Sequence, residues 1–326
     1  MKFLRVHFLN VGRGDCTIIE FPSRRVGIVD IDNLGILDED TARELIGEYY
    51  RSTEYLLAKT LGIRAPDLRE FVRKTYAALS NPLVYYDHHI GKEREIFRLL
   101  ITHPDMDHMT GLYRLYEQES RSILNFWHTG LHDFSLDDAN WEDSPYEKCD
   151  WETYKKLRSG RPGGPRSLQN YQGAIGNYWT EDGVEVWAPT PELERLAVDK
   201  DEPNILSMVL KISYAGRSIV LGGDATAEDS WPAILEDVDV PHVDVLKASH
   251  HGRKSGYYGP AVKAMSPWLA ITSVADAEHD ATENYRRYSE HTVSLRKAGD
   301  IRITIEEDGM LYYSRNAEEH WKPRQS

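Results

Sequence analysis

The sequence has few cysteines and no long apolar run, and these two features exclude several classes of protein. Its 326 residues include two cysteines, Cys16 and Cys149, which stand far apart and in no Cys-x-x-Cys pair. A disulfide framework and a thiolate zinc site are therefore excluded. No apolar stretch approaches the ~18 residues of a membrane span, and the N-terminus lacks the apolar run of a signal peptide. We expect a cytoplasmic protein that does not bind a membrane.

Basic residues are also in short supply. Acids outnumber bases 53 to 39, which gives a formal net charge of −14. This charge disfavours binding to long nucleic acid by bulk attraction, but it leaves open a local phosphate site built from metal ions or a few arginines. With 40% hydrophobic residues, the chain can bury a sizeable core.

The apolar pattern predicts strands in both halves of the chain, with helices between and after them. Alternation of apolar and polar residues indicates a strand over 3–8, and a second strand follows the glycine-containing turn at 12–14. The fold class is therefore α/β or α+β. Further strands are predicted over residues 26–30, 96–102, 184–189, 208–214, 218–221, 243–247, 269–274 and 301–306.

Two segments interrupt this pattern. Residues 38–95 have the character of a helical insertion, because apolar residues recur near helical spacing over 38–80 and predict a helical hairpin. Packing between helices is the simpler interpretation of that apolar stripe, and a surface that docks a protein partner is the alternative. Residues 130–180 are rich in Trp, Tyr and Asp and contain a Gly/Pro-rich stretch, so we expect a loop-rich insertion there.

The strongest chemical signal lies directly after the strand predicted over 96–102. His103, Asp105, Asp107 and His108 place four potential metal ligands within six residues. A strand cannot turn all four to one point, because its side chains alternate between faces, whereas a loop leading into a helix can. His103 and Asp105 can then reach one metal ion, and Asp107 and His108 a second. Imidazole and carboxylate suit zinc, manganese or iron(II).

Three other predicted strands end in residues of the same character. Asp30 ends one strand, and Asp224 follows two glycines after another. The pair His250 and His251 follows a third. Glycines before Asp224 allow the backbone to approach a buried centre closely. Acids and histidines at several strand ends are typical of an assembled α/β active site.

These pieces resemble the metallo-β-lactamase fold, and within it the ComEC-like branch of metallo-hydrolases. The pattern His-x-Asp-x-Asp-His, then Gly-Asp, then Ser-His-His-Gly occurs in the order of that family. The matches span residues 3 to about 310. They include residues 8–15, similar to the branch's opening FLNVGQGD, the acidic motif at 29–30, the Asn-x-x-Ser strand at 204–210, and 250–255, similar to HHGSxxS.

The resemblance implies one domain over residues 1–326, folded as a four-layer αββα sandwich with a metal site at one edge. It also implies two divalent ions, Zn²⁺ or Mn²⁺. Asp30, Asn204 and Ser207 would support the ligands from behind. The implied ligands are His103 and Asp105 for the first metal, Asp224 as the bridge, and Asp107, His108 and one histidine of the pair His250 and His251 for the second. Of this pair we favour His250.

The chain departs from the family pattern at three places. Asp105 stands where a second histidine is usual, and the segment with Asn204 and Ser207 stands where the better-known members have another histidine. The first metal therefore has fewer nitrogen ligands, which makes Mn²⁺ or an exchangeable metal plausible. Arg253 replaces the serine that follows His-His-Gly.

The expected function is that of a metal-dependent hydrolase in which two ions generate hydroxide at neutral pH. Asp107 and Asp224 would position the hydroxide, and His251 would donate a proton. The substrate expected from the resemblance is a phosphodiester of a nucleic acid or nucleotide, and Lys247, Arg253 and Lys254 would contact its phosphate. The alternatives are hydrolysis of a small ester, lactone or amide at the same metals, and a non-enzymatic module that binds a partner.

Overall fold

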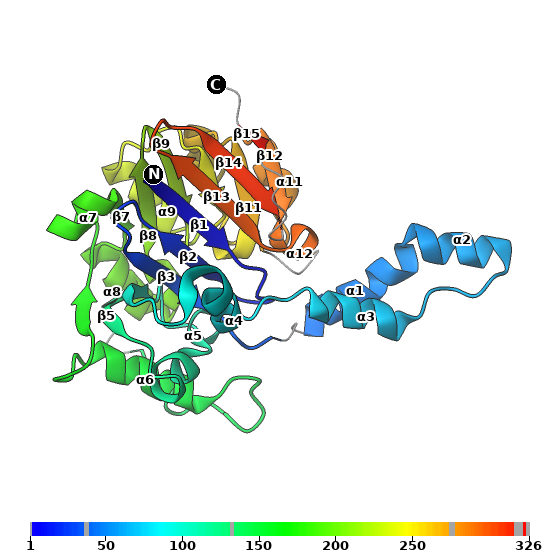
Figure 1. Cartoon of the computed structure of the whole chain (residues 1–326), viewed down its shortest axis with the longest axis horizontal. Helices are drawn as coiled ribbons and strands as arrows, with labels where there is room; N and C mark the ends of the chain where they lie inside the picture. The colour runs from blue at the N-terminus through cyan, green and yellow to red at the C-terminus, as the bar shows by residue number, and fades with distance from the viewer. Residues whose placement is uncertain (1, 36–38, 131–133, 274–277, 316–321, 324–326) are drawn as a thin grey trace.

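The computed structural model describes residues 2–35, 39–130, 134–273, 278–315 and 322–323, with the backbone alone for 39–42, 44–45, 75–77 and 322–323. Two β-sheets form the body of the molecule (Figure 1). In spatial order, the first consists of β15 (Lys322–Pro323), β14 (Leu311–Arg315), β13 (Ile301–Glu306), β1 (Phe3–Phe8), β2 (Cys16–Glu20), β3 (Val26–Ile31), β4 (Ile96–Leu100), β5 (Ile123–His128) and β6 (Arg166–Gln169). The second consists of β12 (His291–Ser294), β11 (Leu269–Thr272), β10 (Val245–Lys247), β9 (Arg217–Leu221), β8 (Val209–Tyr214) and β7 (Val184–Ala188).

Three buried apolar clusters define four layers. Because strand side chains alternate between faces, Ile19 of β2 lies in the cluster between the sheets and Ile18 in the cluster outside them. On the outer face of the first sheet pack α4 (Pro82–Tyr86), α5 (Met106–Met109) and α6 (Lys148–Arg158). On that of the second pack α8 (Pro191–Lys200), α9 (Ser230–Asp237), α10 (Gly259–Met265) and α11 (Thr282–Tyr285). The predicted αββα sandwich is confirmed.

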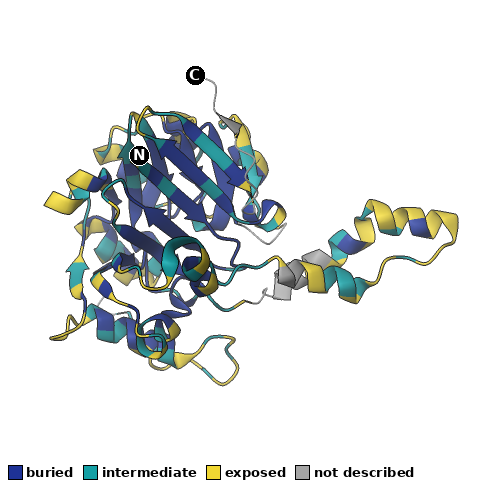
Figure 2. Cartoon of the chain, in the orientation of Figure 1, coloured by how far each residue is buried: buried dark blue, intermediate teal, exposed yellow. Residues whose placement is uncertain are grey.

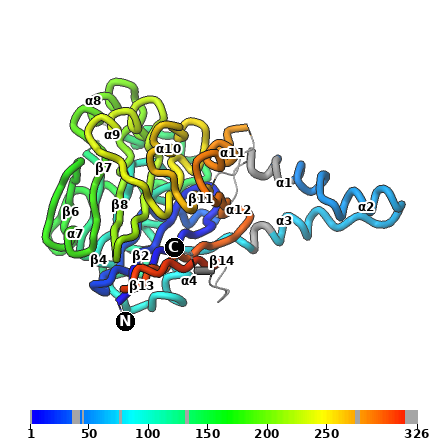
Figure 3. Tube along the Cα trace, turned by 90° about the horizontal axis from the view of Figure 1, so that it is seen from above, coloured from blue at the N-terminus to red at the C-terminus, as the bar shows by residue number. Residues whose placement is uncertain are grey.

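The predicted helical insertion is largely an arm that projects from the sandwich (Figures 1 and 3). It contains α1 (Glu39–Arg51), α2 (Thr53–Leu61) and α3 (Leu68–Ala77). Ser52 caps α2 by accepting a hydrogen bond from Tyr55 N at 3.2 Å, and Gly62 ends it in the left-handed region. The arm is mostly exposed (Figure 2), including Leu61 and Ile63. Partner binding through 38–80 stays a prediction, and residue 38 itself lies outside the described residues.

The rest of both insertions belongs to the sandwich. After the arm, α4 and a π-helix at Asp87–Gly91 return to the first sheet. Within 130–180, α6 buries Trp151, Tyr154 and Leu157, which lie on one helix face at i, i+3 and i+6. β6 then adds the edge strand and α7 (Asn177–Asp182) follows. This segment therefore contains more regular structure than the loop-rich insertion that we predicted. The division of the chain into one domain with two insertions stays a prediction.

Parallel pairing aligns the strand ends that matter for function. β3 and β4 run parallel in the first sheet, and β9 and β10 run parallel in the second. Their carboxyl ends therefore lie at one edge of each sheet, where Asp30, His103, Asp224 and the loop after β10 follow. Within the described residues, no helix combines the length and the apolar character that crossing a membrane requires.

Candidate metal centre

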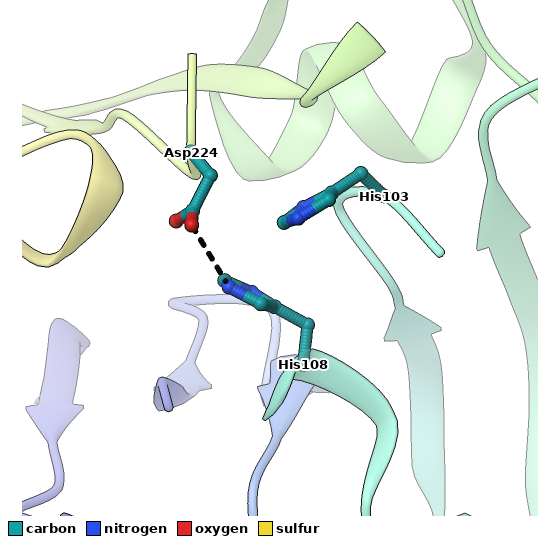
Figure 4. Close-up of side chains that lie close together, drawn as sticks. All are labelled: His103, His108 and Asp224. Carbon is teal, nitrogen blue, oxygen red and sulfur yellow. Dashed lines mark ion pairs between the residues drawn. The ribbon is translucent and has the colours of Figure 1, made fainter. Parts of the chain in front are cut away.

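The three segments that follow β4, β9 and β10 bring acids and imidazoles together. His103, His108 and Asp224 point toward one another, as Figure 4 shows. His108 Nε2 lies 3.3 Å from Asp224 Oδ2, and His251 Nε2 lies 3.4 Å from the same oxygen. His251 Nε2 is also 3.4 Å from Asp107 Oδ2. Residues 121 positions apart in the chain, His103 and Asp224, therefore meet at one buried point.

Several polar atoms at this point have no hydrogen-bond partner among the residues that the structure describes. They are His103 Nε2, His108 Nε2 and Asp224 Oδ1, all buried. Leaving such atoms unsatisfied inside a protein costs about 1–3 kcal/mol each, so a folded chain needs a reason to gather them. A divalent cation satisfies imidazole nitrogen and carboxylate oxygen together. The donor set therefore fits a bound metal ion.

The backbone near Asp224 shows why glycines precede it. A Cβ atom on Gly223 would lie 2.4 Å from Ser207 Oγ and 2.9 Å from Met208 O. The absence of a side chain lets the loop close on Ser207, whose Oγ accepts a hydrogen bond from Asp224 N at 2.6 Å. Ser207 Oγ also lies 3.4 Å from His103 Nδ1. Ser207 thus contacts two of the predicted ligands from behind, and Asn204 contributes its backbone oxygen to the same turn.

Three residues of the centre adopt the left-handed backbone conformation that favours glycine. The φ angle is +56° at Asp30, +49° at His250 and +59° at His251. A non-glycine residue held there costs of order 1 kcal/mol or more, and such strain concentrates at functional sites. In the turn after β10, this left-handed conformation at both residues gives the two adjacent histidines different environments. His251 is buried, and His250 is partly exposed.

Asp30 holds one of the imidazoles from behind. Its Oδ2 lies 2.8 Å from His108 Nδ1, while Thr102 donates to both carboxylate oxygens through N (2.7 Å) and Oγ1 (2.8 Å). The bond to Asp30 occupies Nδ1 and turns Nε2 toward Asp224. The supporting role of Asp30 toward a bound metal stays a prediction.

Asp15 holds the other imidazole, and the sequence analysis did not single it out. Its Oδ2 lies 3.5 Å from His251 Nδ1 and 2.7 Å from Lys247 Nζ. Lys247 is 4% exposed and donates a second bond to Ser273 Oγ at 3.0 Å. The ammonium group that we predicted to meet a phosphate is therefore buried in an internal ion pair. The only sequence signal for Asp15 is its place at the end of the opening motif 8–15.

The carboxylates of the centre shift the pKa values of the neighbouring histidines. Burial alone would lower the pKa of both His108 and His251, but the neighbouring carboxylates dominate. Asp224 and Asp30 raise the pKa of His108 well above its usual value, and Asp224 and Asp15 raise that of His251 to about 10. Burial and the nearby His108 lower the pKa of His103. Without a metal, two imidazolium ions thus balance the carboxylates.

Other predicted residues lie at the rim. Asp105 begins α5 as its N-cap, with Oδ1 accepting from Met106 N at 2.8 Å, and it belongs to none of the ligand groups found among the described residues. His250 Nε2 lies 3.7 Å from Asp224 Oδ2. Arg253 N donates a hydrogen bond to His250 O at 2.8 Å, and Lys254 Nζ donates one to Glu278 O at 2.6 Å.

The rim also contains a cation that the sequence analysis missed. Arg13, on the loop between β1 and β2, places Nε 4.0 Å from Asp107 Oδ2, and its side chain is 38% exposed. The guanidinium lies 5.7 Å from the ring centre of Tyr146. The roles of all these residues stay predictions. The geometry favours His251 over His250 as the metal ligand. His251 is buried, and it lies close enough to share a metal ion with Asp107 and His108 or with Asp15 and Asp224.

Comparisons with known proteins find only distant structural similarity. The sequence matches no protein-family model and no curated protein. Among solved structures, Igni18, a metallo hydrolase from Ignicoccus hospitalis, is similar with a TM-score of 0.48 at 12% identity, over 93% of this chain and 99% of that chain. CmlA, a diiron β-hydroxylase from Streptomyces venezuelae, is similar with a TM-score of 0.47 at 12% identity, over 94% of this chain. This chain spans 54% of CmlA. The ComEC-like branch stays a prediction.

Proposed function

We propose that the chain is a metal-dependent hydrolase that cleaves phosphodiesters of nucleotides or nucleic acid. The observation that carries this proposal is the convergence of unpartnered, buried atoms of His103, His108 and Asp224 on one point. Buried polar atoms left without a hydrogen bond are uncommon in folded proteins, and a bound metal ion would satisfy these three together. We propose that the site binds two divalent ions, Zn²⁺ or Mn²⁺, and that Asp224, which lies near His103, His108 and His251, would help to hold them.

The rim favours an anionic substrate. Arg13 stands beside Asp107 and its side chain is 38% exposed, so one guanidinium group lies at the partly exposed side of the centre. Guanidinium groups bind phosphate oxygens in a bidentate manner. A local arginine fits a single phosphodiester better than the charge of −14 fits a long polymer.

The protein groups have distinct tasks in this proposal. When bound, the metal ions would supply Lewis acidity, which lowers the pKa of water and stabilises charge on the substrate. Asp107, with 14% of its side chain exposed, is the carboxylate best placed to orient water. Burial lowers the pKa of His250 to about 4, so its ring is neutral at pH 7. Ser255 Oγ lies 2.9 Å from His250 Nδ1 and helps to hold this ring in place.

The test uses the full chain, stripped with a chelator and supplied with Mn²⁺ or Zn²⁺. We expect hydrolysis of bis-p-nitrophenyl phosphate that depends on the added metal and is lost in Asp107→Asn. Asp229→Asn, a surface carboxylate paired with Lys200, is the matched control and should keep full activity. Single-stranded DNA, RNA and cyclic nucleotides then identify the class of phosphodiester.

Two other outcomes would reject the proposal. Metal-dependent hydrolysis of lactones or esters without any phosphodiester cleavage would assign the site to small-molecule hydrolysis. A chain that takes up no metal, and whose behaviour a chelator leaves unchanged, would indicate a binding module instead.

A further inference from the structure

A lysine and a carboxylate are buried together behind the metal centre. Asp15 is 5% exposed and Lys247 is 4% exposed, and their charged atoms are 2.7 Å apart. Ser273 Oγ completes the group by donating to Asp15 Oδ1 at 2.9 Å and accepting from Lys247. Removing two charges from water costs several kcal/mol, so a buried ion pair is poor evidence of a stabilising device. The position of this ion pair behind the metal centre suggests that it orients a metal ligand.

The pair contacts the back of one ligand ring. Asp15 Oδ2 lies 3.5 Å from His251 Nδ1, and the opposite ring nitrogen, Nε2, is 3.4 Å from both Asp107 and Asp224. A carboxylate at Nδ1 fixes both the tautomer and the orientation of an imidazole. At 3.5 Å this contact is an ion pair without a hydrogen bond, and it places the carboxylate on the Nδ1 side of the ring, opposite Asp107 and Asp224.

A second carboxylate, Asp30 of β3, supports the other buried imidazole in a similar way. Asp30 contacts His108 Nδ1 at 2.8 Å, and His108 Nε2 faces Asp224 at 3.3 Å. Thr102 holds Asp30 through two hydrogen bonds, as Lys247 and Ser273 hold Asp15. Two imidazoles thus approach Asp224, His108 after a strand of the first sheet and His251 after a strand of the second, and each has a carboxylate from the first sheet on its Nδ1 side.

The geometry also separates positioning from direct metal binding. Asp15, Asp224 and His251 lie close enough to form a ligand group of their own. Both oxygens of Asp15 are already engaged, however, Oδ2 by Lys247 and Oδ1 by Ser273. The ammonium group stands beside the oxygen that a further cation would need, and it would repel that cation.

The loop that bears Asp15 is seated tightly against the metal-binding loop. A Cβ atom on Gly14 would lie 1.8 Å from Asp107 O and 2.7 Å from Asp32 Cβ. No larger residue fits at 14 without moving one of the loops. The position of Asp15 relative to Asp107 is therefore fixed by backbone packing.

We propose that Asp15, held by Lys247 and Ser273, is a positioning residue that orients His251 toward the metal centre. The inference rests on the proposed function only in taking His251 as a metal ligand. Asp15→Asn alone would leave the Lys247 ammonium buried without a charged partner, which endangers folding. The double variant Asp15→Asn/Lys247→Met removes both charges at constant net charge and keeps the volume of both side chains similar.

The experiment measures Mn²⁺ affinity by calorimetry in the full chain, its double variant, His251→Ala, and the triple combination. We expect the double variant to unfold thermally like the wild type without metal but to bind Mn²⁺ about 10–100-fold more weakly. In the His251→Ala background the same two changes should leave the remaining affinity nearly unchanged, because Asp15 acts through that ring.

Other results would overturn the inference and leave the proposed function standing. Wild-type affinity in a folded double variant would show that Asp15 positions nothing. Losses that multiply in the His251→Ala background would show that Asp15 acts on the metal by another route. Failure of the wild type itself to bind Mn²⁺ or Zn²⁺ would instead reject the proposed function.

Discussion

The two halves of the metal centre support their imidazoles with different chemistry. In one half, His108 and His251 are backed by the carboxylates of Asp30 and Asp15. In the other, His103 Nδ1 has the hydroxyl groups of Thr102 at 3.1 Å and Ser207 at 3.4 Å. We call these the carboxylate half and the hydroxyl half. A carboxylate raises the basicity of a ligand imidazole and a hydroxyl does so far less, so the two halves should hold a metal unequally.

The halves also differ in their complement of ligands. The carboxylate half combines Asp107, His108 and His251, with Asp224 within reach. The hydroxyl half has His103 and Asp224, while the Asp105 side chain caps α5. Four potential ligands close together in the sequence, as at 103–108, therefore need not form two metal sites of equal strength. The predictions below test this inequality, beginning with the residue that both halves share.

Replacing the shared carboxylate should have the largest effect. Asp224→Asn keeps the side-chain shape but removes the charge that faces His108 and His251. We expect metal affinity to fall by more than the roughly 100-fold typical of losing a supporting partner. Calorimetry with Mn²⁺ measures it, with Asp229→Asn as the control. Retained affinity would show that the two halves do not meet at Asp224.

The two halves should respond differently to pH. A metal binds the neutral imidazole, so each protonated ligand must release its proton first. The pKa of His251 is raised to about 10 and that of His108 well above its usual value, whereas burial lowers the pKa of His103. Affinity should therefore rise with pH between pH 6 and 8, by about tenfold per unit for each proton released.

Calorimetry in buffers of different ionisation enthalpy counts the protons released. His103→Ala should leave the count unchanged, and His251→Ala should lower it. An affinity that does not change between pH 6 and 8 would contradict the charge pattern of the carboxylate half.

Alanine substitutions in the two halves compare their strengths directly. We expect His108→Ala to remove the tight metal, and His103→Ala to weaken only the second ion, with about a tenfold smaller loss of affinity for the first. Elemental analysis after dialysis gives the number of ions that each variant retains. Loss of both ions in His103→Ala would mean that the hydroxyl half is the stronger one.

The sequence predicts the ends of strands better than the contacts between them. Hydrophobic runs that stop at Asp30, His103 and Asp224 predict ligands at strand ends, and the structure brings these strand ends to one place. Parallel pairing explains this success, because it aligns the carboxyl ends of neighbouring strands.

The pairing of Lys247 with Asp15 could not be predicted in the same way. The two residues lie 232 positions apart, and no local period links the loop after β1 to β10. From the sequence alone, a lysine next to a histidine motif predicts a phosphate contact, because the sequence does not show whether the lysine is buried. The helix α6 escaped prediction for a related reason: Trp151 and Tyr154 are core residues in a segment whose surroundings are polar.

Asp105 provides the smallest effect and the sharpest test of the hydroxyl half. As an N-cap, its replacement by alanine should lower the free energy of unfolding by about 1 kcal/mol, while Asp105→Asn, which still caps, should change it little. Neither change should alter metal affinity if the carboxylate only caps α5. If Asp105 instead binds the metal, both substitutions remove the charged ligand, and both variants should bind metal more weakly. Urea unfolding and Mn²⁺ calorimetry on the two variants separate these roles, because the cap distinguishes alanine from asparagine and the ligand role does not.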